Sequence, residues 1–136
     1  MQIALISCVK SKKQIPCKTK DMYTSTLFHF AYKYAQHRKV DKIFILSAKY
    51  GLLDENQLIE PYEMTLNTMK NSAILAWSNN VIKQLEKLTN LSDDNFIILA
   101  GDRYRKYLLP YMNNYEIPME GLSFGRQLSW LKNQLS

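Results

Sequence analysis

The sequence is poor in the residues that mark linkers, disulfide scaffolds and membrane spans. It has four glycines, four prolines and two cysteines in 136 residues, which argues against a linker-rich or low-complexity chain. Cys8 and Cys17 are too few for a disulfide framework, so we expect a reducing, cytoplasmic setting. No apolar run approaches the roughly 20 residues of a spanning helix, and no membrane association is expected. The apolar start, 1–9, has no basic residues before it and lysines after it, so no signal peptide is expected.

What is present predicts one packed domain over residues 1–136. Hydrophobic residues make up 46% of the chain, enough for a sizeable core. Short apolar runs predict buried strands, and apolar residues at helical spacing predict helices that alternate with them. This alternation predicts an α/β fold, a three-layer sandwich whose mainly parallel sheet of about four strands has helices on both faces. The strands are expected at 3–6, 43–46, 96–99 and 115–117, and the helices at 24 or 25 to 37, 71 or 72 to 88, 102–109 and 126–135, with loops at 47–70 and 118–125.

Polar or small residues follow three of these strands at the point where each strand ends. The three endings are Ser7-Cys8, Ser47-Ala48-Lys49 and Ala100-Gly101-Asp102. The carboxyl ends of parallel strands meet at one edge of a sheet, which is where ligands bind in such folds. The pattern therefore predicts a polar site at this edge.

Positive charge is concentrated beside the first of these endings. The net charge is +6, and the first twenty residues hold Lys10, Lys12, Lys13, Lys18 and Lys20 with no acidic residue. Such a field attracts phosphates or a nucleic-acid backbone, although a solvated lysine-rich loop is an alternative of similar weight. Two arginines add to it: Arg105 follows Gly101 by one helical turn, and Arg126 lies at a predicted helix start, where an anion is favoured but a surface role is the alternative. These cations indicate a phosphate-bearing ligand.

Aromatic residues are frequent near the same segments, and bases stack on such rings. In a domain this small most aromatic side chains pack in the core, so each one is individually more typical of structure than of binding. Tyr50 and Tyr62 are the better binding candidates because they lie in predicted loops. The aromatic residues in question are Tyr23, Phe28, Tyr50, Tyr62 and Tyr104.

Several familiar catalytic and metal-binding patterns are missing. There is no Walker loop, no GxGxxG and no GxSxG. His29 and His37 lack a carboxylate pattern and indicate ordinary helix residues, and their spacing from the two cysteines matches no standard zinc site. No metal and no cofactor are therefore expected. Cys8 could act as a nucleophile activated by nearby lysines, but a buried thiol is the commoner case.

Seven short blocks follow one another in order along nearly the whole chain. They are Ser7-Cys8-x-Lys10-x-Lys12, Pro16-Cys17, Asp21-Met22-Tyr23-x-Ser25-x-Leu27-Phe28, Ile45-Leu46-Ser47-Ala48-Lys49-Tyr50-Gly51-Leu52-Leu53, Glu60-Pro61-Tyr62-x-x-Thr65-Leu66, Leu99-Ala100-Gly101-x-x-Tyr104-Arg105 and Gly121-Leu122-x-x-Gly125-x-Gln127-Leu128-x-Trp130-Leu131. Together these blocks resemble a family of bacterial and phage domains related to YaaA. The resemblance implies protection from peroxide stress and DNA binding, although this chain is much shorter than YaaA and shows no helix-hairpin-helix segment. It also implies similarity to modules attached to enzymes of deazapurine base exchange, and a weaker, fold-level analogy with uracil-DNA glycosylases.

Three functions stay open on this reading. The first is an enzyme acting on a nucleobase, a nucleotide or a glycosidic bond, with Asp102 as general base and Lys49 and Ser47 supplying polar or acid–base chemistry. The second is a non-catalytic nucleic-acid or nucleotide binding module, and the third a protein–protein adaptor; no oligomeric state follows from the sequence. The expected substrate-binding residues are Ser7, Cys8, Lys10, Lys12, Tyr23, Ser25, Tyr50, Gly51, Tyr62, Gly101, Tyr104, Arg105, Gly125, Arg126 and Gln127.

Overall fold

A five-stranded sheet forms the centre of the protein in a computed structural model that describes residues 1–136. The strands lie in the order β4-β3-β1-β6-β7. The pairs β1–β3, β1–β6 and β6–β7 are parallel, and β4 runs antiparallel to β3. The predicted α/β class is confirmed, but the sheet is mixed and has one strand more than expected. The strands are β1 (Gln2–Ser7), β3 (Lys42–Ser47), β4 (Gly51–Asp54), β6 (Asn95–Leu99) and β7 (Asn114–Glu116).

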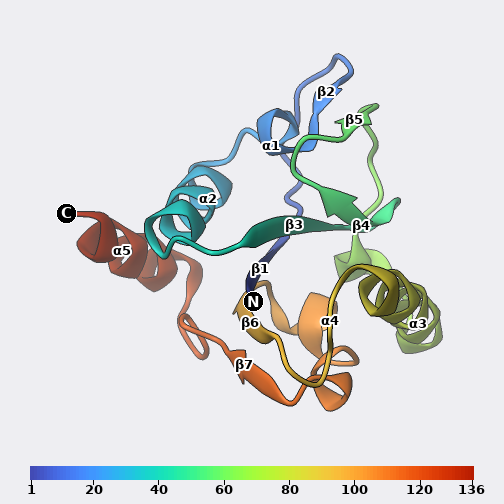
Figure 1. The fold of residues 1–136 in the computed structure, drawn as a ribbon. Coiled ribbons are helices and arrows are strands. Elements are labelled where there is room, and N and C mark those ends of the chain that lie inside the picture. Colours follow the sequence, from blue (N-terminus) through green and yellow to red (C-terminus); the bar gives the residue numbers. More distant parts are fainter.

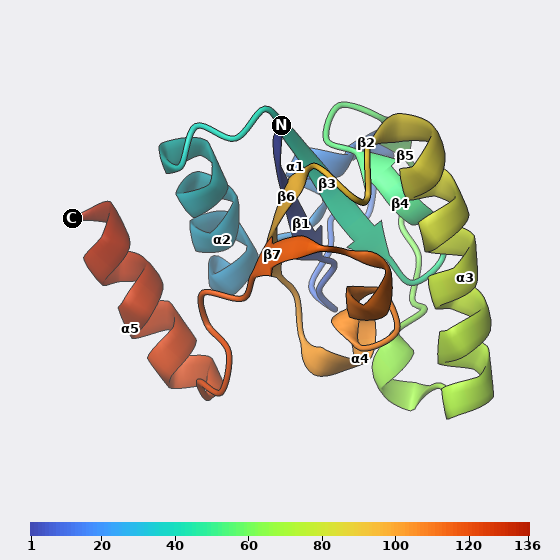
Figure 2. The same ribbon diagram turned by 60° about the horizontal axis from the view of Figure 1, so that its bottom comes forward.

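The helices lie around this sheet in two groups. Figures 1 and 2 show α2 and α5 side by side on one side, and α3 beside β4 on the other. The Tyr34 and Trp130 rings, 5.0 Å apart between centroids, join α2 to α5. No helix is both long and apolar enough to cross a membrane. The helices are α1 (Thr19–Met22), α2 (Thr26–His37), α3 (Asn71–Leu88), α4 (Asp102–Arg105) and α5 (Phe124–Leu135), with 3₁₀ turns η1 (Leu66–Thr68) and η2 (Leu109–Tyr111).

Local sequence explains why α2 begins where it does. The Ser25 hydroxyl accepts a hydrogen bond from the Phe28 amide at 3.1 Å, so Ser25 is the N-cap. The buried residues of α2 recur at helical spacing and pack on the sheet. Ser25, expected in the binding site from the resemblance, therefore has a structural position at the helix start.

Several segments differ from the expectation because long-range pairing decides them. Within the predicted loop 47–70 the chain turns at Gly51 and β4 pairs back on β3, and β5 (Leu58–Ile59) pairs antiparallel with β2 (Cys17–Lys18). The α4 helix ends at Arg105 rather than Leu109, and α5 begins at Phe124 rather than Arg126. Two-residue strands have no periodicity of their own, so the sequence alone could not reveal β2 and β5.

Strand order creates a switch point beside the central strand β1. From β1 the chain crosses through α2 to β3 on one side, and from β4 it crosses through α3 to β6 on the other side. The two connections therefore run to opposite sides of β1. Open α/β sheets characteristically bind ligands at such a point, here the carboxyl ends of β1 and β6.

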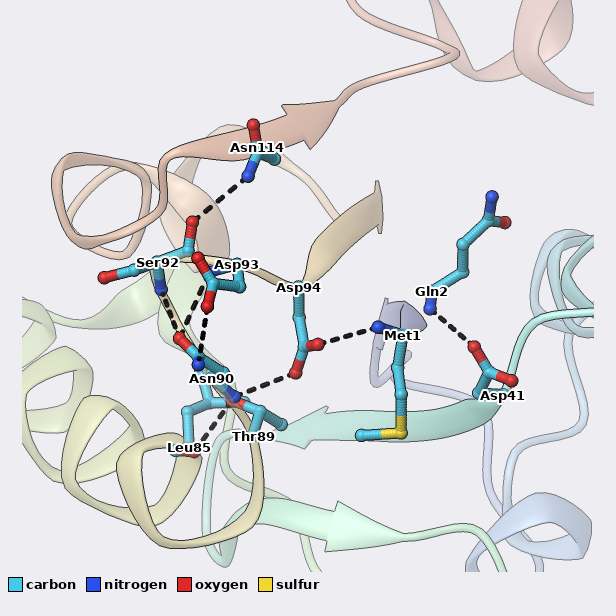
Figure 3. A network of polar contacts seen from close by, with 10 residues as sticks. All are labelled: Met1, Gln2, Asp41, Leu85, Thr89, Asn90, Ser92, Asp93, Asp94 and Asn114. Carbon is cyan, nitrogen blue, oxygen red and sulfur yellow. Dashed lines mark hydrogen bonds and ion pairs between the residues drawn. The ribbon is translucent and has the colours of Figure 1, made fainter.

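A polar network fastens the opposite, amino edge of the sheet (Figure 3). The Asp94 carboxylate accepts hydrogen bonds from the Met1 ammonium and from the Asn90 amide, each at 2.8 Å. Asp41 accepts from the Gln2 amide at 2.6 Å. Because these groups lie where β1, β3 and β6 start, they hold the register of the sheet at the end away from the strand-end site.

Asp94→Asn is expected to destabilise the protein while leaving ligand binding intact. The hydrogen bonds from the Met1 ammonium and the Asn90 amide lower the pKa of the Asp94 carboxyl. A lowered pKa means that its stabilising effect is complete above about pH 4 and is lost as the pH falls further. We expect the variant to lose about 1 kcal/mol at pH 7, measured by urea unfolding, and to show a weaker acid dependence than wild type. An unchanged acid limb of the stability curve would contradict this role.

Candidate functional site

Three predicted strand endings do meet at one edge of the sheet. β3, β1 and β6 are parallel neighbours, and the Cys8 amide continues the β1–β3 pairing by donating to the Leu46 carbonyl at 2.9 Å. A cavity of about 560 Å³ opens between the ends of β1 and β6. We call it the first cavity; its lining includes Ser7, Cys8, Lys10, Leu27, Phe28, Ala31, Asn67, Gly101, Asp102, Arg103, Tyr104, Arg105, Ile117, Met119 and Gln127.

The first cavity has apolar walls and a charged rim. Leu27 and Phe28 come from α2, and Ile117 and Met119 from the segment between β7 and α5. Lys10 and Arg103 are exposed cations in the lining, whereas Arg105 is half-buried and donates to the Ala100 carbonyl at 2.9 Å. The arrangement can hold a flat apolar group inside and an anion at its rim.

A second cavity of about 490 Å³ adjoins the first. Six of its ten lining residues are polar or charged, and half of the ten come from residues 63–68, which lead into η1 and include it. The same five residues, Cys8, Val9, Lys10, Asn67 and Tyr104, line both cavities. The second cavity is completed by Lys12, Glu63, Met64, Thr65 and Thr68.

A thiol and a phenol meet where the two cavities adjoin. The Cys8 sulfur lies 3.4 Å from the Tyr104 hydroxyl, and that hydroxyl accepts from the Leu66 amide at the same distance. Burial raises the pKa of Tyr104, so the phenol keeps its proton and can donate to the sulfur. Tyr104 is also held by an edge contact with the Trp77 ring, at 5.7 Å between centroids. Cys8 itself is buried at 7% exposure.

Lys12 is the half-buried cation of the second cavity. Its ammonium lies 4.6 Å from the centroid of the Tyr62 ring and donates to the Lys10 carbonyl at 3.3 Å. Partial burial lowers the pKa of Lys12. An anionic ligand arriving here would gain a cation that has already lost part of its water.

Beneath Lys12 lies a buried chain of hydroxyl groups. Ser47 donates to the Tyr62 hydroxyl at 2.8 Å, and the Tyr62 and Tyr23 hydroxyls are 2.6 Å apart. The Ser47 hydroxyl also accepts from the Tyr50 amide at 3.0 Å. Burial raises the pKa values of Tyr23 and Tyr62, so both phenols stay protonated. Ser47 and Tyr23 have no exposed surface, and this chain ties two loops to the end of β3.

The structure brings together only part of the predicted site. Lining at least one cavity are Ser7, Cys8, Lys10, Lys12, Gly101, Asp102, Tyr104, Arg105 and Gln127. Outside both cavity linings are Ser25, Ser47, Lys49, Tyr50, Gly51, Tyr23, Tyr62, Gly125 and Arg126. Tyr23 and Tyr62 still support Lys12 from below. Exposed Lys49 lies over the Tyr50 ring, with its ammonium 5.2 Å from the centroid.

Sequence reasoning missed several residues that complete the cavities. Arg103 adjoins Asp102 and was detectable as a further cation beside Arg105 at the β6 ending, but Asn67, Glu63 and Thr68 had no signal of their own. They reach the site because the chain after β5 returns across the end of β1, a path that only the tertiary structure decides. No group of three or more His, Cys, Asp or Glu side chains is arranged to hold a metal ion.

Comparison with known proteins places the chain in a family. Residues 3–133 match the model of a family of unknown function, DUF6884. The chain belongs to the DUF6884 family. No curated protein and no solved structure matches it significantly. For this DUF6884 member, the two cavities at the strand ends are therefore the starting point for a functional argument.

Proposed function

We propose that this protein is a nucleotide- or nucleic-acid-directed domain that binds a phosphate-bearing ligand at the carboxyl ends of β1 and β6. The observation that supports it best is the first cavity, which lies at the switch point of the sheet and combines apolar walls with cations at the rim. Its volume of about 560 Å³ lies within the range of small-molecule sites. An apolar interior suits a nucleobase, and Lys10, Arg103 and Arg105 suit its phosphate.

An enzymatic version of this proposal assigns Asp102 the role of general base. Asp102 is an exposed carboxylate in the lining of the first cavity, at the start of α4. A base held in this cavity with its glycosidic bond toward the rim would face that carboxylate, which could orient a water molecule for hydrolysis. Release of a nucleobase by wild type but not by Asp102→Asn, at equal ligand affinity, is the result this version requires.

A non-catalytic binding module is the alternative function. It uses the same cations and apolar walls and needs neither Asp102 nor turnover. Buried Ser47 and the distant Lys49, both candidates for catalytic chemistry, lie outside the cavities, and this favours binding over a multi-residue catalytic centre. Three further expectations are compatible with both versions and stay predictions. They are kinship with YaaA-related domains, a three-layer arrangement of the fold and a cytoplasmic setting.

The test is nucleotide and nucleic-acid binding by wild type, Lys10→Ala and Lys13→Ala. Lys10 lines both cavities, whereas Lys13 is an exposed lysine three positions away that lines neither. We expect Lys10→Ala to weaken binding of labelled mononucleotides, single-stranded DNA, duplex DNA or RNA about tenfold, because it removes one charge-assisted phosphate contact. Lys13→Ala is expected to change affinity less than about twofold at 150 mM salt.

Salt dependence separates the site from a general basic surface. Loss of Lys10 should reduce the slope of log affinity against log salt by about one, whereas Lys13→Ala should leave it nearly unchanged. Equal losses in the two variants would mean that binding follows the field of the whole lysine-rich segment rather than the cavity. Absence of binding to every one of these ligands would remove the proposal.

A further inference from the structure

Two adjoining cavities with different linings share one wall. Cys8, Val9, Lys10, Asn67 and Tyr104 belong to both linings, so the two cavities adjoin at these residues, which we call the junction. The volumes are similar, about 560 and 490 Å³, and each lies within the range that holds one small-molecule unit. A ligand that fills both must therefore have two parts of similar size.

The linings differ in what they can recognise. The first cavity offers apolar contacts from the half-buried side chains of Leu27, Ile117 and Met119. By contrast, the second offers the hydroxyls of Thr65 and Thr68 and the carboxylate of Glu63. An apolar pocket suits a base, whereas hydroxyl and carboxylate groups suit the hydrogen-bonding edges of a second base or the hydroxyls of a sugar.

Cations occur in both cavities and at the junction between them. Arg103 and Arg105 line only the first cavity, Lys12 only the second, and Lys10 both. Lys12 lies against the Tyr62 ring with its ammonium 4.6 Å from the centroid, so it is held in place. A ligand with anionic groups at its centre and near its ends would place a negative charge beside each of these cations. A single mononucleotide bound in the first cavity would leave the second cavity empty and Lys12 without an anion.

We propose that the two cavities together bind one ligand made of two linked nucleoside units, with the connecting phosphate at Lys10. This inference rests on the proposed function, because it requires the first cavity to accept a nucleotide. The first unit places its base between the apolar walls, and the second unit lies beside Thr65 and Thr68. Both a free dinucleotide and the end of a longer strand offer this chemistry.

The experiment compares 5′-phosphorylated adenylates of one, two and four units by calorimetry on wild type, Thr68→Trp and Thr68→Ser. Thr68 is exposed at the rim of the second cavity, so a tryptophan there fills that cavity without entering the core. In wild type the dinucleotide is expected to bind at least about tenfold more tightly than the mononucleotide, because the second unit binds intramolecularly. Thr68→Trp should abolish this gain and keep the mononucleotide affinity, and Thr68→Ser, which keeps the hydroxyl, should keep the gain.

Alkylation of Cys8 gives an independent measure of occupancy. Cys8 is at the junction, and Cys17 lies in β2 outside both cavities, so Cys17 is an internal control. We expect the dinucleotide to slow iodoacetamide labelling of Cys8 and to leave the labelling of Cys17 unchanged, as read by mass spectrometry. Equal rates for Cys8 with and without saturating dinucleotide would overturn the inference.

The remaining outcomes separate this inference from the proposed function. Equal affinity for one and two units would overturn the two-cavity inference and leave the proposed function standing. No affinity for any adenylate, nor for the other nucleotides and nucleic acids tested above, would overturn both. A tetranucleotide that equals the dinucleotide identifies a strand end, and one that is excluded identifies a free dinucleotide. A tetranucleotide whose gain survives Thr68→Trp would mean that the strand follows the surface, which overturns the inference.

Discussion

Gly51→Ala is expected to lower the free energy of unfolding by about 2–3 kcal/mol, from two causes. Gly51 has φ +77°, a conformation that costs an L-residue roughly 1–2 kcal/mol. An added Cβ would also lie 2.5 Å from the Gln84 side-chain oxygen, which accepts from the Leu52 amide at 2.9 Å. Displacing Gln84 would break that bond and leave the Leu52 amide of β4 without its partner, at a cost of about 1 kcal/mol.

Two other glycines separate these causes in the same urea unfolding experiment. Gly121 has φ +81° with nothing near a built Cβ, so Gly121→Ala measures the backbone cost alone. Gly125 has open space and lies in α5 without a positive φ, so Gly125→Ala should be neutral or slightly stabilising. The expected order of stability is Gly125→Ala, then Gly121→Ala, then Gly51→Ala. A Gly51→Ala protein as stable as Gly121→Ala would show that Gln84 moves without cost.

Tyr62→Phe should have the second largest effect, a loss of about 2 kcal/mol in the free energy of unfolding. Its hydroxyl accepts from Ser47 at 2.8 Å and lies 2.6 Å from the Tyr23 hydroxyl. All three residues are buried, so removing the central hydroxyl leaves two polar groups without their partner. The phenylalanine ring stays under Lys12, and nucleotide affinity should therefore fall far less than stability.

Tyr50→Phe is the matched control for this substitution. The Tyr50 hydroxyl makes one long, exposed contact with the Glu60 carbonyl at 3.4 Å, so its loss should change stability by less than about 0.5 kcal/mol. A double-mutant cycle with Tyr23→Phe should give a coupling energy of about 1 kcal/mol between Tyr23 and Tyr62. Additive effects would mean that the two hydroxyls do not support each other, and the chain from Ser47 to Tyr23 would then not be a cooperative unit.

Regular elements with strong local patterns were predictable from the sequence. The apolar runs at 3–6, 43–46 and 96–99 are the three central parallel strands, and α3 (Asn71–Leu88) matches the helix expected from 71 or 72 to 88. Because parallel strands end at one edge, the convergence of Cys8, Lys10 and Asp102 was also predictable. The kinship with YaaA-related domains and the nucleic-acid-directed function stay predictions.

Burial separated the predicted site residues into two groups. Ser47, Tyr23 and Tyr62 follow strand ends or lie in loops, as binding residues do, yet their hydroxyls satisfy one another inside the core. A sequence does not show whether a polar side chain faces solvent or another polar side chain. Gly51, another expected binding residue, also has a structural position. It has a positive φ and lies close to the Gln84 side chain of α3, which explains why a glycine stands there.

Local sequence patterns are sufficient to predict the class of fold, the three parallel strands and the concentration of lysine beside the end of β1. These features depend on local periodicity and composition, which act within a few residues. Three features became visible only in the folded chain: the antiparallel β4, the pairing of β2 with β5, and the return of 63–68 across the end of β1, which forms the second cavity. Such features depend on contacts between segments distant in the chain, whose free energy comes from burial and pairing once the core has formed.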